Sequence, residues 1–280
     1  MTGRPRDRGR TTRRWSFTIT GAVLLTAAAV ATGALNESSE SFTVAEETTA
    51  EGVAACKGNK RVVSGGFSAP DWVEGGPVIQ PVDSTRDGKH AWRSREHNFG
   101  TAEEATAYAY CGGGVGKLKA KSKSATLDPD ELDVVRAKCP RGSQAVAGGF
   151  DMPDPEGPAD YTIVYSSKRG GKRAWKTKFF NGFLDPRAVS TEVYCLEGKA
   201  GLKTKSKAVE QNEGDNDSVA AKCKRGQQLV SGGFAGEIND AENISSTVIA
   251  SRRSSKRKWK VSAFADAGEP KLKAFAYCQT

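Results

Sequence analysis

Histidine is almost absent from this chain of 280 residues, in which only His90 and His97 occur. No G-x-S-x-G motif is present either, so a Ser-His-acid site repeated along the chain is excluded. Paired carboxylates of the glycosidase type are not excluded by sequence, but the acidic residues mostly fall in turns that differ between the repeats described below. We therefore expect no catalytic residues and a protein that is not an enzyme.

Patterns for metals and small-molecule cofactors are also missing. The chain has no C-x-x-C pair, which argues against zinc. The Asp-rich turns around residues 128–133 and 215–217 lack the full spacing and the terminal Glu of a calcium loop. No G-x-x-x-x-G-K pattern accompanies the Gly-Gly pairs, so they do not form a phosphate loop. The sequence predicts neither a metal nor a cofactor.

The N-terminus has the pattern of an export signal. Residues 1–14 hold six Arg against one Asp, and the 19 residues from Phe17 to Leu35 carry no charge. Small residues near the end of this run offer a cleavage site, whereas its length is also just sufficient for an uncleaved anchor. We predict a hydrophobic signal helix within residues 1–35, acting as signal peptide or signal anchor. The body is then extracellular or cell-wall-associated, or membrane-anchored with the body outside.

Both the N-terminal signal and the body beyond residue 52 are basic, and an acidic segment separates them. The whole chain has a formal net charge of +9, of which residues 1–14 contribute +5. The segment 36–52, read as an acidic linker and first strand, holds five Glu and no Lys or Arg. The remaining body is therefore strongly basic.

Three copies of one repeat occupy residues 53–116, 117–199 and 200–280. A shift of 83 or 84 residues aligns VAACKGNKRVVSGGF, VRAKCPRGSQAVAGGF and VAAKCKRGQQLVSGGF. From its first cysteine, each copy has Gly-Gly-Phe ending at plus 11, Ser at plus 28 and Trp at plus 36, and it closes on Tyr-Cys. Coincidences at so many fixed offsets indicate a structural repeat.

Short alternating segments rich in β-branched and aromatic residues predict strands throughout the body, with no helical stripe. The segments KLKAKSKSATL and GLKTKSKAVEQ, each followed by a polar turn and the cysteine strand, are interpreted as hairpins. This gives five or six strands per copy. We expect an all-β protein of three tandem disulfide-closed antiparallel β modules, with one pseudo-threefold β-prism as the alternative. The Gly-Gly pair predicts a bulge or a close backbone approach.

Six cysteines, two in each copy, have separations of 55, 56 and 55 residues within the copies. The simplest of the 15 connectivities closes each copy on itself, and export favours oxidation. The predicted disulfides are Cys56 with Cys111, Cys139 with Cys195, and Cys223 with Cys278.

The recurring Trp lies in KHAWR, KRAWK and KRKWK, flanked by cationic residues in every copy. This motif suits stacking on a sugar ring or holding an anionic polymer. A small β domain also needs a large buried aromatic residue, which favours Trp as core and the charges as a solvated hairpin turn. The candidate polyanion-binding residues are Lys89, Arg93, Lys172, Arg173, Lys176, Lys256, Arg257 and Lys260.

The order A-x-C-P-x-G, G-G-F, Trp and A-Y-C over residues 53–280 resembles a tandem repeat of uncharacterised secreted actinobacterial proteins. That resemblance implies export and a β fold without an assigned activity. Pro follows the first cysteine only in the second copy, as Pro140. The C-P-x-G element and the threefold repetition are also similar to the vitelline membrane outer layer protein family, which implies a β-prism.

Two functions fit these features. The leading hypothesis is an exported protein that binds an anionic cell-wall or extracellular polymer through basic turns, with membrane contact only if the N-terminal segment is uncleaved. The alternative is a passive structural or protein-contacting surface protein, in which the charge serves solubility alone.

Overall fold

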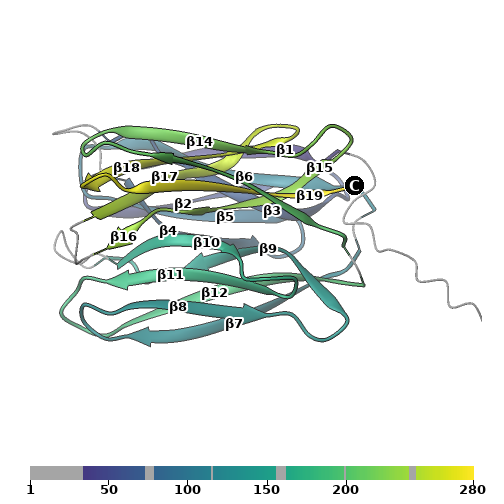
Figure 1. The fold of residues 1–280 in the computed structure, drawn as a ribbon, viewed down its shortest axis with the longest axis horizontal. Coiled ribbons are helices and arrows are strands. Elements are labelled where there is room, and N and C mark those ends of the chain that lie inside the picture. Colours follow the sequence, from purple (N-terminus) through teal and green to yellow (C-terminus); the bar gives the residue numbers. More distant parts are fainter. Residues whose placement is uncertain (1–33, 73–78, 115, 156–161, 199, 240–243) are drawn as a thin grey trace, which may run out of the picture.

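The computed structural model describes residues 34–72, 79–114, 116–155, 162–198, 200–239 and 244–280. The predicted signal helix lies outside these residues. The described part is built of β-strands that run along one long axis, with the connecting loops at its two ends (Figure 1). Among the described residues, no helix has the length and apolarity needed to cross a membrane.

Each copy contributes six main strands, which confirms the all-β prediction. The first copy has β1 (Asn36–Val44), β2 (Thr48–Ala55), β3 (Arg61–Ser68), β4 (Ile79–Asp87), β5 (Ala91–Asn98) and β6 (Glu103–Gly112). The second has β7 (Leu118–Leu127), β8 (Leu132–Lys138), β9 (Ser143–Asp151), β10 (Thr162–Arg169), β11 (Ala174–Asn181) and β12 (Arg187–Glu197). The third has β13 (Lys203–Glu210), β14 (Asn216–Lys222), β15 (Gln228–Ala235), the short β16 (Ile238–Asn239), β17 (Ile244–Ser255), β18 (Lys258–Ala267) and β19 (Lys271–Gln279).

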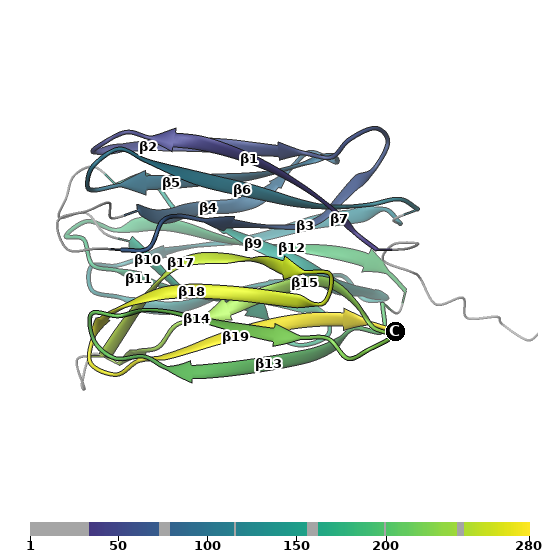
Figure 2. The same cartoon turned by 90° about the horizontal axis from the view of Figure 1, so that it is seen from above.

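Every sheet is shared by two copies. Sheet A has the order β1-β6-β3-β17-β18-β14, with β16 beside β17; sheet B has β2-β5-β4-β9-β12-β7; sheet C has β13-β19-β15-β10-β11-β8. The three copies therefore form a closed, pseudo-threefold prism, which was the alternative arrangement. Figure 2 shows strands of the first copy (purple to blue) at the top and strands of the third copy (green to yellow) at the bottom. The three copies are disulfide-closed and antiparallel as predicted, but they are not arranged as separate beads, because three short ladders join each copy to both of the others.

The leading strands of each copy do not form the predicted hairpins. β1 pairs with β6 and β2 pairs with β5, and the corresponding strands of the other copies divide in the same way. The turn between them lies where the polar residues predict it, but it leads from one sheet to another. Phe42 of β1 covers Gly52 of β2, where an added Cβ would lie 2.3 Å from the ring. The two strands thus bury their apolar faces against each other, face to face.

The Gly-Gly pair makes two close approaches, as the sequence predicted. An added Cβ would lie 2.1 Å from the Trp92 ring at Gly65, and 2.2 Å from the Ser251 carbonyl oxygen at Gly66. The first glycine therefore admits the tryptophan of its own copy, and the second admits the backbone of a neighbouring copy. The same two contacts recur at Gly148 and Gly149 and at Gly232 and Gly233.

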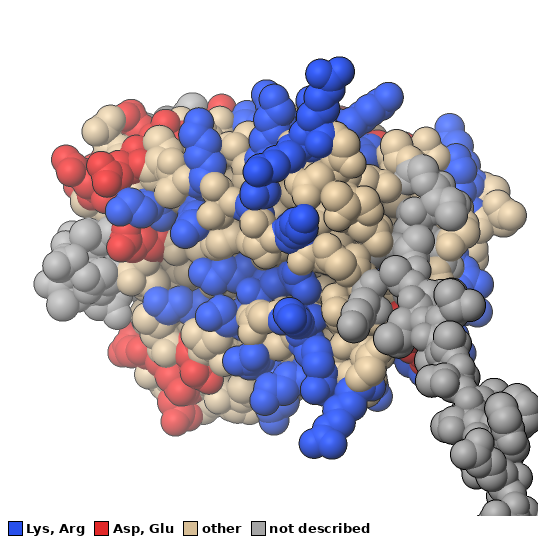
Figure 3. Space-filling view, turned by 45° about the vertical axis from the view of Figure 1, so that its right-hand side comes forward, with Lys and Arg blue, Asp and Glu red and all other residues tan. Residues whose placement is uncertain are grey.

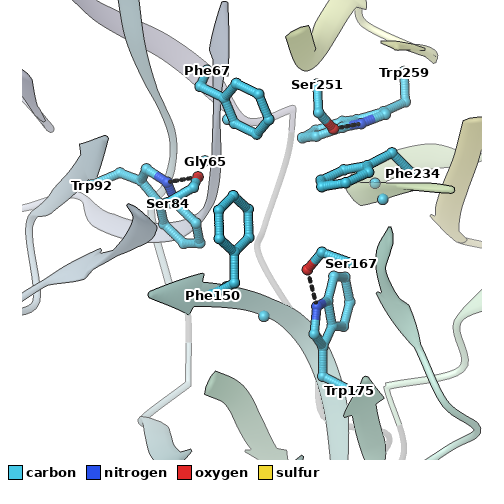
Figure 4. Close-up of a pocket in the computed structure, with 15 residues that line it drawn as sticks. Gly65, Phe67, Ser84, Trp92, Phe150, Ser167, Trp175, Phe234, Ser251 and Trp259 are labelled. Atoms are coloured by element: carbon cyan, nitrogen blue, oxygen red, sulfur yellow. Dashed lines mark hydrogen bonds between the residues drawn. The ribbon is translucent and has the colours of Figure 1, made fainter. Parts of the chain in front are cut away.

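The phenylalanine after each Gly-Gly pair reaches the centre of the prism. Phe67, Phe150 and Phe234 meet edge to face, with centroids 6.0–6.1 Å apart (Figure 4). A cavity of about 20 Å³ lies among these rings, the glycines and the three tryptophans, which is room for about one water molecule. The centre of the molecule is thus a packed core to which all three copies contribute equally.

The three disulfides pair as predicted, Cys56 with Cys111, Cys139 with Cys195 and Cys223 with Cys278. Each one links the end of a strand in one sheet to a strand in the facing sheet, and the structure has no free cysteine among its described residues. Bonds of this kind indicate an oxidising environment outside the reducing cytosol.

Candidate functional site

The loops at the two ends of the prism differ in origin. Because successive strands run antiparallel, every second connection returns to the same end. One end collects the loops after each first cysteine, the Trp hairpin turns and the loops after each Tyr-Cys strand. The other collects the turns after the leading strands and the loops that enter β4, β6 and their equivalents.

The described loops at the end with the cysteine loops carry positive charge only. Its described loop residues include eleven Lys or Arg and no Asp or Glu. They are Lys57, Lys60, Lys89, Lys117, Arg141, Lys172, Arg173, Lys224, Arg225, Lys256 and Arg257. We call this end the basic end.

The described loops at the opposite end carry negative charge only. Its described loop residues include twelve Asp or Glu and no Lys or Arg. They are Glu46, Glu47, Asp71, Asp128, Asp130, Glu131, Asp154, Asp185, Glu213, Asp215, Glu237 and Glu269. We call this end the acidic end, and Figure 3 shows its red patches at the left, apart from the broad blue surface.

A few charges of the other sign lie at strand ends rather than in the loops. At the basic end, Glu197 Oε1 forms an ion pair with Lys119 Nζ at 2.5 Å. Glu37 Oε2 lies 3.5 Å from Arg253 Nε. Glu197 and Glu37 are therefore neutralised locally, whereas Asp87, at the end of β4, has no ion pair among the described residues. They do not alter the separation of charge along the long axis of the prism.

The Trp turn of each copy is fixed to the cysteine loop of the same copy. The backbone amides of Cys56, Cys139 and Cys223 donate to the carbonyls of His90, Arg173 and Arg257 at 2.6, 2.7 and 2.9 Å. In the second copy the Arg173 guanidinium also donates to the Cys139 carbonyl at 2.7 Å. The basic loops of one copy thus form a braced unit held by the disulfide.

Five of the eight residues predicted to bind polyanions lie in Trp turns of the basic end. They are Lys89, Lys172, Arg173, Lys256 and Arg257. The other three lie on strands, on the outer faces of three different sheets: Arg93 on β5, Lys176 on β11 and Lys260 on β18. Arg93 is already paired, because its Nε donates to Asp83 Oδ2 at 2.6 Å. The structure therefore does not bring these three residues together with the turns.

The recurring tryptophans are core residues, which confirms that interpretation. Trp92, Trp175 and Trp259 are 1–2% exposed. Their indole N–H groups donate to Ser84, Ser167 and Ser251 at 2.9, 2.7 and 3.0 Å, which explains the serine at plus 28 (Figure 4). A buried indole cannot stack on a sugar, so any polymer contact falls to the charged residues around it.

Sequence reasoning missed a recurring arginine two residues after that serine. The backbone amides of Arg86, Arg169 and Arg253 donate to the hydroxyls of Tyr194, Tyr277 and Tyr110, respectively. In each pair the tyrosine belongs to a different copy from the arginine. Each of these tyrosines also meets the tryptophan of the same neighbouring copy edge to face, at 5.5–5.6 Å. The arginines stand at plus 30 in all three copies, so the alignment contained this signal.

Two buried carboxylates distinguish the first copy. Asp83 and Glu96 are both 0% exposed, and burial raises the pKa of Asp83 to about 6 and that of Glu96 well above its usual range. Ser94 donates to Glu96 Oε1 at 2.8 Å. Neither carboxylate is open to solvent. Among the described residues, no group of three or more His, Cys, Asp or Glu is placed to hold a metal.

Comparison with protein-family models gives no match for this chain, and comparison with curated proteins gives none either. No family membership therefore contributes to the functional argument.

Proposed function

We propose that this protein is an exported, non-enzymatic surface protein that binds an anionic polymer end-on through its basic end. The observation that carries the proposal is the separation of loop charge, with eleven cations at one end and twelve anions at the other in the described residues. Charges of one sign gathered on one face attract and orient a polyanion far more than the same charges scattered over a surface.

The three copies repeat the basic loops around the prism axis, so one polymer chain or surface meets several of them at once. Simultaneous contacts raise avidity without any single strong site. Suitable ligands outside a cell are teichoic or other acidic wall polymers, extracellular nucleic acid and anionic membrane lipid. The acidic end, by the same reasoning, points away from such a surface.

The location outside the cell is supported by the three disulfides and the N-terminal charge pattern. The chain enters the fold at the basic end, where Leu35 is buried and its carbonyl accepts a hydrogen bond from Arg253 at 2.8 Å. A retained anchor would therefore hold the basic end toward the membrane.

The rival proposal is a passive structural or protein-contacting surface protein whose charge serves solubility. Salt distinguishes the two, because polyanion binding releases counterions and weakens steeply as salt increases. We would mix residues 34–280 with isolated cell walls at low and moderate salt and measure the sedimented protein. Sedimentation that is lost at moderate salt supports the proposal. Protein that stays in solution at both salts favours the passive role.

A further inference from the structure

A second basic surface lies on the outer face of sheet C, where β10 of the second copy meets β15 of the third. A hollow of about 320 Å³ opens there, lined by Lys168, Lys178, Lys271 and Lys273 together with Glu237. We call it the sheet C groove. It lies on a side of the prism and contains none of the loop residues of the basic end.

The strand register places these cations on one face. Lys168 pairs across β10 and β11 with Lys176, and Ser166 pairs with Lys178. Lys273 of β19 pairs with Ala235 of β15, which in turn pairs with Ser166. The ammonium groups of Lys168 and Lys273 lie 5.2 and 5.4 Å from the centre of the Phe275 ring, which positions both.

The groove has an excess of positive charge. Burial, and then the repulsion of Lys176, Lys273 and Lys178, lowers the pKa of Lys168. Glu237 accepts a hydrogen bond from the backbone amide of Lys271 at 2.8 Å, and the Lys271 ammonium lies 3.6 Å from Glu210. In the described part of the chain, no carboxylate forms an ion pair with Lys168, Lys178 or Lys273.

Sheet B shows how the same junction looks when its charge is balanced. There Arg95 occupies the position of Lys178. Its guanidinium lies 2.9 Å from Asp151, 2.8 Å from Asp154 and 3.7 Å from Asp83. The cation at this junction therefore forms ion pairs with three acids of its own chain.

Sheet C has none of those acids at the equivalent positions and holds additional cations there. Ser166, Ala235 and Ile238 stand at the positions of Asp83, Asp151 and Asp154, by offset from the first cysteine of each copy. Lys168 stands at the position of Thr85 by the same offset. Lys273, which pairs with Ala235, stands at the position of Ser190, which pairs with Asp151. In sheet A the equivalents of Lys168, Lys178, Lys271 and Lys273 are Arg252, Ser262, Glu104 and Thr106. Asp71 there stands at the position of Asp154, so sheet A has one cation and two acids at these positions. The pseudo-threefold comparison thus isolates sheet C as the junction whose cations lack counter-charges.

We propose that the sheet C groove is a binding site for an anionic group, the phosphate or carboxylate of an acidic sugar or polyol unit. The ligand would supply the negative charge that Asp83, Asp151 and Asp154 supply in sheet B. The volume is at the small end of the range for small-molecule sites, which suits one such unit. The inference does not depend on end-on binding by the basic end.

The test titrates residues 34–280, which contain every described strand, with tripolyphosphate and separately with citrate at low salt. Calorimetry gives Kd, and amide chemical shifts of the ¹⁵N-labelled protein locate the bound anion. We expect saturable shifts at Phe275 and its neighbours on β10 and β19. Binding of tripolyphosphate but not of citrate would indicate that the groove recognises phosphate. Binding of both probes would indicate that it recognises negative charge.

Two variants separate the groove from general charge. S166D with A235D installs two of the sheet B acids beside Lys178 and Lys273, and K168Q with K273Q removes two cations. Each should weaken binding at least tenfold and abolish the Phe275 shifts. The matched control K121Q with K123Q removes equal charge from the edge strand β7 and should bind like the wild type. Unchanged affinity in S166D with A235D, or shifts confined to the basic end, would overturn the proposal.

A further variant distinguishes anion binding in the sheet C groove from polymer binding at the basic end. A chain in which Lys89, Lys172, Lys256 and Arg257 are replaced by Gln should keep the Phe275 shifts while losing sedimentation with cell walls. Loss of the shifts in that chain would count against a separate groove. Retention of sedimentation in it would count against the basic end instead.

Discussion

The hydroxyl of Tyr110 accepts a hydrogen bond from the backbone amide of Arg253 at 2.6 Å, and so fastens the first copy to the third. The Tyr110 ring also meets Trp259 edge to face, with centroids 5.5 Å apart. Burial raises the pKa of Tyr110, so the hydroxyl stays neutral at any pH of interest. The tyrosine beside each closing cysteine thus fastens the closed prism.

Removal of that hydroxyl should destabilise the whole prism. Tyr110→Phe leaves the part-buried Arg253 amide without its acceptor, which should lower the free energy of unfolding by about 1–3 kcal/mol. Chemical denaturation of the variant and of the wild type measures the difference. The control is Tyr108→Phe, whose hydroxyl lies on the outer face and contacts Ser68 at 3.2 Å. Equal loss in both variants would contradict the role of Tyr110 between copies.

The glycine under each tryptophan should not tolerate a methyl group. In Gly65→Ala the new Cβ would lie about 2.1 Å from Trp92, so the core must shift at a cost of about 1–3 kcal/mol or more. Gly113→Ala is the matched control, because no atom lies within 4 Å of its added Cβ. Thermal unfolding should show a clearly lower Tm for the first variant alone. A similar Tm in both would mean that the Trp92 contact is looser than the structure shows.

Stability should fall as pH rises from about 4 to about 6. The pKa of Asp83 is raised from 3.8 to about 6 in the folded protein, so folding favours its protonated form. That contribution is complete below the pKa of the unfolded chain and is lost as pH rises through the folded value, on the order of 3 kcal/mol in all. Asp83→Asn should flatten this part of the curve, measured by denaturation at pH steps. Asp130→Asn, in a turn of the acidic end, should leave the wild-type slope, and an unchanged slope in Asp83→Asn would refute the assignment.

The repeated features were predictable because they sit at fixed offsets in three copies. The disulfides, the core role of Trp92 and the close approach at Gly65 all follow from residues whose neighbours lie in the same copy. The alignment shows each of them three times. A contact within one repeat is thus visible in the sequence of that repeat.

The closure of the prism was harder to predict from the sequence. The ladders between copies pair Phe67 with Ser251 and Ser84 with Phe150, residues that look like ordinary members of their own strands. The alternating pattern of the leading strands fits a hairpin as well as two facing sheets. What decides between them is the packing of Phe42 over Gly52, which needs the fold.

The candidate sites depended on topology most of all. The net charge of a sequence does not show where the charges lie on the folded protein. The separation of loop charges becomes visible only when alternate connections are assigned to opposite ends of the prism. The sheet C groove requires a further step, the comparison of Ser166 and Ala235 with Asp83 and Asp151 at equivalent positions. The cationic residues predicted around each Trp include Lys89 and Lys172 in the turns of the basic end, but also Arg93 on β5, which forms an ion pair with the buried Asp83.

The central claim is that the location of the charge, rather than its amount, determines polyanion binding. The most direct measurement compares two chains of equal net charge for their affinity to a soluble wall polymer at several salt concentrations. One replaces Lys89, Lys172, Lys256 and Arg257 of the basic end by Gln; the other replaces Lys121, Lys123, Lys205 and Lys207 of the edge strands β7 and β13. The account predicts at least tenfold weaker binding and a shallower salt dependence for the first chain, with the second close to the wild type. Equal weakening in both chains, or none in the first, would contradict it.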